Sequence, residues 1–167
     1  MPISRTQASD QICGLFKSAT GGYGMPLKQL LGVQLAAFSK QVDIQGAEVV
    51  LDMARAIHLA TLVNELAVNA ARIGALSLPR GKVSIKWFIE DQSYPATFRF
   101  LWEETGGPSV ISTERARFRQ SNVEEMAREL GKSRIDFFPG ELRFELVLLL
   151  DEASSRKQEA EMTNEPV

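Results

Sequence analysis

One helical stretch organises this chain: Asn64-Glu65-Leu66-Ala67-Val68-Asn69-Ala70-Ala71-Arg72-Ile73-Gly74-Ala75-Leu76-Ser77. Within it, Glu65, Asn69 and Arg72 are spaced i, i+4 and i+7, so they share one face of a helix. A carboxylate can accept a proton or hold a water, a carboxamide oxygen can complete a magnesium shell, and a guanidinium can neutralise phosphate. The stretch therefore predicts a nucleotide site beside this helix, and the alternative is a solvated polar stripe on a surface helix.

The composition is that of an ordinary globular domain. The chain has 167 residues, of which 44% are hydrophobic and 24% charged, and its formal charge is −2. This charge offers no basic footprint for nucleic acid. The single cysteine, Cys13, excludes an internal disulfide and favours a cytoplasmic location. No apolar run is long enough to span a membrane, and the N-terminus does not resemble a secretory signal.

Hydrophobic periodicity and turn residues divide the chain into elements. We expect an N-terminal arm over 1–25, a folded domain over 26–150 and a disordered polar tail over 151–167. Within the domain, the patterns predict helices and strands in alternation. Expected helices cover 26–38, 54–73 and 122–130, and expected strands cover 42–44, 49–51, 82–90, 96–103, 134–138 and 141–150.

Local signals refine these elements. Gly74 ends the long helix and is suited to the left-handed conformation of a helix end. The strand over 49–51 is a candidate partner of the strand over 42–44, and Pro139-Gly140 predicts a tight turn between the last two strands. The element order gives an α+β fold, a two-layer sandwich in which helices cover one face of a mixed sheet.

A second motif, Trp102-Glu103-Glu104-Thr105-Gly106-Gly107-Pro108, follows the strand over 96–103. With the first stretch it resembles the ATP-binding catalytic domain of HWE-type sensor histidine kinases, which belong to the GHKL group and share the Bergerat ATP-binding fold. In that family the first box reads approximately His-Glu-Leu-x-x-Asn-Ala-x-Lys-x-Gly-Ala-Leu-Ser, and the second combines Trp-x-Glu with Gly-Gly-Pro. The likeness covers about 27–150.

The resemblance implies roles for individual residues. Asn69 would ligate the Mg²⁺ that bridges the ATP phosphates, Glu65 would act as a base or hold a water in that shell, and Arg72 would lie near the phosphates. Glu104 would accept the adenine amino group, and Gly106 would let the backbone pass close to the base. The alternative for Glu104 is an exposed charge at a strand end, whereas Trp102 is expected in the core.

Three departures from the family pattern bear on activity. The histidine of the first box is Asn64 here, which cannot titrate near neutral pH. The glycines of the third box are replaced by Arg117 and Arg119, which would either clash with the phosphate path or bind phosphate from a rearranged loop. No phosphoacceptor histidine precedes Leu27, and His58, the single histidine, lies inside the long predicted helix.

These observations lead to two principal hypotheses. The first is an ATP- and Mg²⁺-binding, histidine-kinase-like domain of two-component signalling that lacks its own phosphoacceptor histidine and acts on a histidine-bearing phosphotransfer protein or a response regulator. The second is a degenerate, non-catalytic adaptor that docks onto a kinase or response regulator. A homodimer is a further expected assembly. A serine kinase of the anti-sigma type fits the motifs less well.

Overall fold

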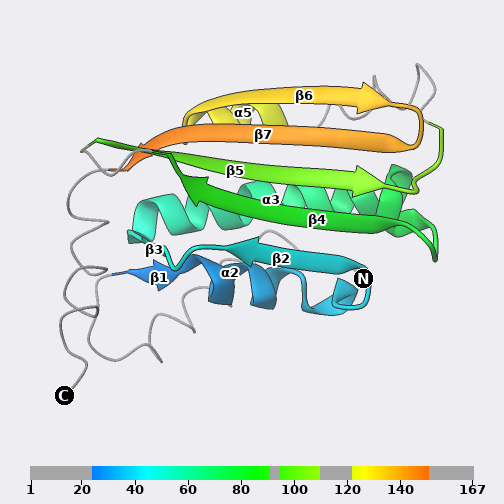
Figure 1. Ribbon diagram of the computed structural model, residues 1–167, viewed down its shortest axis with the longest axis horizontal. Coiled ribbons are helices and arrows are strands. Elements are labelled where there is room, and N and C mark those ends of the chain that lie inside the picture. Colours follow the sequence, from blue (N-terminus) through cyan, green and yellow to red (C-terminus); the bar gives the residue numbers. More distant parts are fainter. Residues whose placement is uncertain (1–23, 91–94, 110–121, 151–167) are drawn as a thin grey trace.

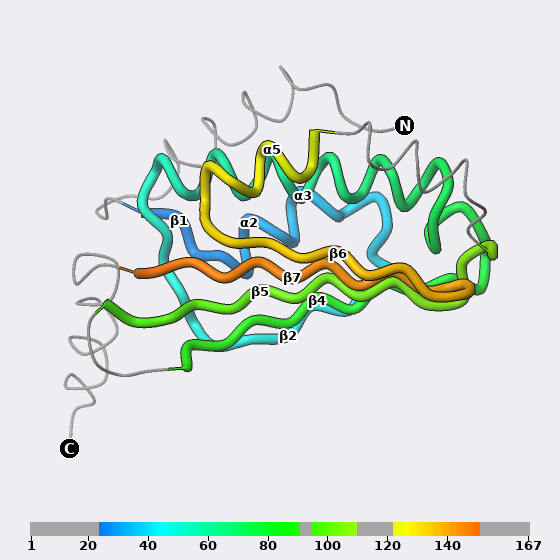
Figure 2. Tube along the Cα trace, turned by 90° about the horizontal axis from the view of Figure 1, so that it is seen from above, coloured from blue at the N-terminus to red at the C-terminus, as the bar shows by residue number. Residues whose placement is uncertain are grey.

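The computed structural model describes residues 24–90, 95–109 and 122–150. Two layers are seen in Figures 1 and 2: a five-stranded sheet, and helices that cover one of its faces. The helical elements are α2 (Leu27–Gln34), η1 (Ala36–Phe38), α3 (Met53–Ile73), η2 (Ala75–Ser77) and α5 (Val123–Arg128). The strands are β1 (Met25–Pro26), β2 (Val42–Gly46), β3 (Val50–Leu51), β4 (Lys82–Ile89), β5 (Ala96–Thr105), β6 (Lys132–Phe138) and β7 (Glu141–Leu150).

The sheet is mixed, as the sequence predicts. Its strand order is β2-β4-β5-β7-β6, with β2 parallel to β4 and every other neighbouring pair antiparallel. The central strand β5 alternates in burial along its length, so that Phe98, Phe100, Trp102 and Glu104 face the helices. Alternate residues of a strand point to opposite faces, and this period places Glu104 inside while Glu103 faces out.

The long helix α3 forms the centre of the helical layer, where it contacts both α2 and α5. Its N-terminus is capped by Asp52, whose carboxylate accepts a hydrogen bond of 2.9 Å from the backbone N–H of Arg55. Its buried stripe includes Leu59, Leu66 and Asn69. Among the described residues, no helix combines the length and the apolar character needed to cross a bilayer.

The structure corrects two predicted local features and shortens one helix. The strand β3 pairs with β1 in a separate two-stranded sheet, so it is not the partner of β2. Gly74 has φ −112° and ψ −157°, which is extended and not left-handed. The helix predicted over 26–38 breaks after Gln34, where Leu35 leaves helical geometry and a short 3₁₀ turn, η1, follows.

The predicted turn before the last strand is confirmed, whereas several other predictions concern residues that the structure does not describe. Gly140 has φ +70° in the tight turn between β6 and β7, a conformation that glycine adopts without steric cost. Met25, assigned to the arm from sequence, is fully buried in the core. The expected arm up to residue 23, the tail over 151–167 and the arginine-rich segment with Arg117 and Arg119 lie outside the described residues.

Candidate functional site

A pocket opens where the C-terminal end of α3, the end of β5 and the β6–β7 turn meet. About 370 Å³ of space between its walls and at its open mouth is free of protein atoms. Its walls are largely apolar, and two polar side chains, Asn69 and Glu104, contribute to them. The lining residues are Asn69, Ile73, Gly74, Ala75, Glu104, Gly107, Pro108, Phe137, Gly140, Glu141 and Leu142. Both sequence motifs therefore contribute to one concave site, the kind of place where small molecules bind.

Glu104 is the buried acid of this pocket. Its side chain is only 3% exposed, which rules out the alternative of an exposed charge at a strand end. The backbone N–H of Ala75 donates to Glu104 Oε2 (2.8 Å), and the indole N–H of Trp102 donates to Glu104 Oε1 (3.0 Å). Burial raises the pKa of the Glu104 carboxyl above its ordinary value, while these two hydrogen bonds oppose the rise.

The position of the Glu104 carboxylate leaves no room for a side chain at residue 74. A Cβ at position 74 would lie 2.2 Å from Glu104 Oε2 and 2.9 Å from the Cα of Ala70. The glycine therefore allows the end of α3 to approach the strand so closely that the next residue, Ala75, can donate its N–H to the acid. Close approach to Glu104, and not a left-handed helix end, explains the glycine at the end of the long helix.

Asn69 lies near the C-terminal end of α3, five residues before Gly74, and is 7% exposed. Its Nδ2 atom is buried and has no hydrogen-bond partner. A buried amide donor without a partner costs free energy, and such an atom beside a pocket indicates that a ligand completes the site. Asn69 is thus the second polar group that the pocket presents to a ligand.

Three other predicted site residues within the described part of the chain, Glu65, Arg72 and Gly106, are not among those that line the pocket. Glu65 is partly exposed one turn before Asn69, and Arg72 is exposed one turn after it. Gly106 has φ +69° and lies against the backbone of Arg80 and Gly81. The adjacent Gly107 lines the pocket instead. The sequence spacing therefore placed Glu65, Asn69 and Arg72 on neighbouring helical positions but did not show which of them is buried.

Several lining residues were not identified from the sequence. Phe137, Gly140 and Leu142 come from the β6–β7 hairpin, more than thirty positions after Glu104. The backbone N–H of Gly107 donates to the carbonyl of Gly140 (3.0 Å), and this bond joins the hairpin turn to the end of β5. The Pro139-Gly140 turn was a detectable signal, but nothing in the sequence shows that it lies beside Gly107.

Curated proteins similar in sequence to this chain are histidine kinases. No protein-family profile matches the chain. Over 117 residues, 68% of this chain and 24% of the relative, it is 27% identical to a blue-light-activated histidine kinase of Brucella ovis. Over 101 residues, 58% of this chain and 21% of the relative, it is 31% identical to the same kinase of Brucella anthropi. The chain is therefore similar in sequence to histidine kinases, in agreement with the resemblance of its two motifs to the HWE type.

Similarity to a solved structure extends beyond the matched sequence. The histidine kinase domain of the Erythrobacter litoralis EL346 blue-light-activated kinase superposes with a TM-score of 0.64. The match covers 97% of this chain and 78% of that one at 15% sequence identity, so it shows the fold alone. The chain spans less than a quarter of the length of the curated kinases that it matches.

Proposed function

We propose that the pocket binds ATP together with Mg²⁺, and that the domain serves as a histidine-kinase-type phosphotransfer domain in two-component signalling. The observation that carries this proposal is the pairing of a buried acceptor, Glu104, with an unpartnered buried donor, Asn69 Nδ2, in one largely apolar pocket. An aromatic base suits apolar walls with few polar groups, and Glu104 is the acceptor for its amino group.

The residues present fit a magnesium nucleotide. Within the described residues there is no group of three or more His, Cys, Asp and Glu side chains that could hold a metal by itself. Mg²⁺ bound to a nucleotide needs no such group, because it keeps several waters and takes most other ligands from phosphate oxygens. Asn69 would supply its carboxamide oxygen to that shell, its Nδ2 would donate to a phosphate oxygen, and the bound ion would neutralise charge on the phosphates.

The residues on the flank of α3 complete the proposal. Glu65 would hold a water of the magnesium shell or act as a base, and the exposed Arg72 would attract the phosphates. The arginine pair Arg117 and Arg119 is the proposed phosphate contact of the segment after β5. The proposed partner is a histidine-bearing phosphotransfer protein or a response regulator, which would bring its phosphoacceptor to the γ-phosphate.

Calorimetric titration with ATP, with and without Mg²⁺, tests this function. We expect Mg²⁺-dependent binding that Asn69→Ala weakens at least tenfold, because the buried carboxamide is lost from the site. Gln29→Ala, which removes an exposed carboxamide from α2, is the control and should bind as the unmodified protein does. Absence of binding at millimolar ATP would overturn the proposal and favour the adaptor function.

A further inference from the structure

The neighbours of Glu104 within the sheet are apolar. Val83 on β4 and Leu142 on β7 stand opposite Glu104 in register, and both are buried. Neither side chain can donate a hydrogen bond. The side chains opposite Glu104 on the adjacent strands therefore do not set the orientation of its carboxylate.

The side-chain donor comes from the same strand. Trp102 precedes Glu104 by two residues, so both side chains lie on the inner face of β5. The indole is fully buried in the core, and its N–H reaches Glu104 Oε1 at 3.0 Å. Because close packing fixes the indole ring, the direction of this N–H is also fixed. Trp102 thus links the packing of the core to the orientation of the acid.

The second carboxylate oxygen is held from the opposite element. Ala75 donates its backbone N–H to Glu104 Oε2, and this donor belongs to the segment that follows α3. Each oxygen therefore has one protein donor. An ionised carboxylate has about four acceptor positions, so roughly two remain. Since Glu104 lines the pocket, a ligand can use this remaining capacity.

We propose that Trp102 is a positioning residue that holds Glu104 in the orientation needed to recognise an exocyclic amino group, and so makes the site selective for 6-aminopurine nucleotides. This inference rests on the proposed nucleotide binding. It assigns to the tryptophan of the second motif a role in specificity, in addition to its place in the core. The recognised group is a neutral N–H donor on an aromatic base.

The selectivity test compares ATP with purine riboside triphosphate, which lacks the 6-amino group. Trp102→Phe retains an aromatic side chain and removes the N–H. We expect it to weaken ATP binding about tenfold, which is typical of a lost hydrogen bond to a charged group, and to change purine riboside triphosphate binding less than twofold. The preference of the unmodified protein for ATP should largely disappear.

The other tryptophan provides a matched control. Trp87 is 2% exposed, and its indole N–H donates to the carbonyl of Ala47 (2.7 Å), away from the residues that line the pocket. Trp87→Phe therefore also removes a buried indole N–H donor from the same sheet, although its acceptor is a backbone carbonyl and not a carboxylate. We expect this variant to keep the preference for ATP, even where its unfolding temperature falls as much as that of Trp102→Phe.

A pH titration adds a readout that a packing defect would not move. The Trp102 hydrogen bond lowers the pKa of Glu104, so its removal should shift the acidic limb of ATP binding to higher pH in Trp102→Phe and not in Trp87→Phe.

Should Trp102→Phe fail to fold, benzothienylalanine can replace the remaining tryptophan of the Trp87→Phe protein. That residue keeps the bicyclic shape and lacks the N–H.

The outcomes separate the two proposals. If the unmodified protein binds neither nucleotide, the proposed function fails. If it binds ATP and the Trp102 variants lose affinity equally for both nucleotides, or retain the ATP preference, the positioning role is overturned while the proposed function stands. Selective loss of ATP binding, restricted to the Trp102 variants, would support the role.

Discussion

Two adjacent glutamates of β5 occupy opposite environments. Glu103 faces the open side of the sheet, where the Arg143 guanidinium donates to its carboxylate at 2.7 Å and both side chains remain partly exposed. Glu104 faces the helices, is buried, and accepts hydrogen bonds from the neutral N–H groups of Ala75 and Trp102. The same chemical group is thus neutralised by an ion pair on one face and left available to a ligand on the other.

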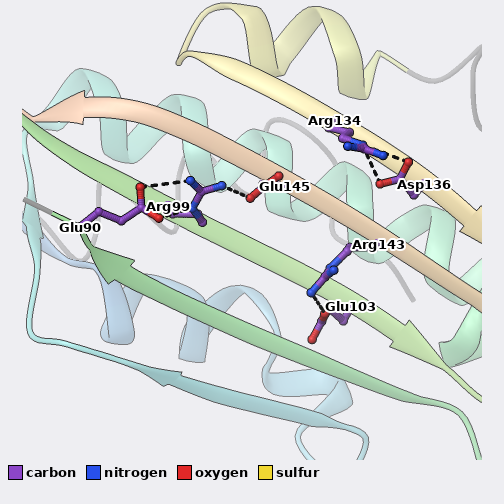
Figure 3. Close-up of polar contacts among 7 residues, drawn as sticks. All are labelled: Glu90, Arg99, Glu103, Arg134, Asp136, Arg143 and Glu145. Carbon is purple, nitrogen blue, oxygen red and sulfur yellow. Dashed lines mark hydrogen bonds and ion pairs between the residues drawn. The ribbon is translucent and has the colours of Figure 1, made fainter.

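The open face carries several ion pairs along neighbouring strands. Figure 3 shows Arg99 between Glu90 and Glu145, and separately Arg143 with Glu103. A further pair joins Arg134 and Asp136 within β6. Such exposed pairs contribute little stability each, because water screens them. The charges of the outer face are thus paired with one another, whereas Glu104, the one buried acid among the residues that the structure describes, lines the pocket.

The largest expected effect comes from Gly74→Ala. The added methyl would meet Glu104 Oε2 at 2.2 Å, so either the acid or the end of α3 must move. We expect a loss of about 1–3 kcal/mol in the free energy of unfolding, as is typical of overpacking in a core, together with loss of nucleotide binding. Urea denaturation and ATP titration measure the two effects.

Gly32→Ala is the matched control for this substitution. Gly32 lies within α2, and a Cβ there would have no atom within 4 Å. Because alanine favours helix over glycine, this variant should gain about 0.5–1 kcal/mol in stability. Equal destabilisation by both variants would show that contact with Glu104 does not explain the effect at position 74.

An intermediate effect is expected from the pH dependence of stability in Glu104→Gln. Burial raises the pKa of Glu104 in the folded state, so between the unfolded and folded pKa values the native protein binds a proton that the unfolded chain lacks. Stability of the unmodified protein should therefore fall as pH rises through this window, with a slope no steeper than about 1.4 kcal/mol per pH unit for one proton.

Glutamine does not titrate, so Glu104→Gln should lack this pH-dependent loss of stability. As pH increases above about 4.5, near the pKa of an unperturbed glutamate, the variant should therefore gain stability relative to the unmodified protein. Urea denaturation at a series of pH values measures it. A constant difference across the series would mean that burial of the carboxylate does not perturb its titration, and the comparison with Glu103 would lose its basis.

The smallest expected effect comes from Glu103→Gln. Its ion pair with Arg143 is partly exposed, so removal of the charge should cost less than about 1 kcal/mol, and the cost should shrink at high salt. Nucleotide affinity should be unchanged, because Glu103 is not among the residues that line the pocket. A change in ATP affinity comparable to that of Glu104→Gln would contradict the separation of the two faces.

Much of the fold follows from local sequence signals. The alternation of burial along β4, β5 and β7 and the apolar stripe of α3 are visible as hydrophobic periodicity, which explains why these elements were predicted within a few residues. The short strand β3 was paired with the wrong partner. Two-residue strands carry almost no pattern, and their pairing depends on long-range contacts that a local pattern does not contain.

For the candidate site too, some features follow from the sequence and others only from the tertiary structure. Helical spacing identified Asn69 as a candidate, whereas Glu104 became one through the resemblance of its motif to a family box. Tertiary structure alone decided that these two groups share a pocket, that Gly74 is needed for contact with Glu104, and that the β6–β7 hairpin forms a wall. Burial and hydrogen bonding between distant segments arise only when the helix packs onto the sheet, and no local pattern encodes them.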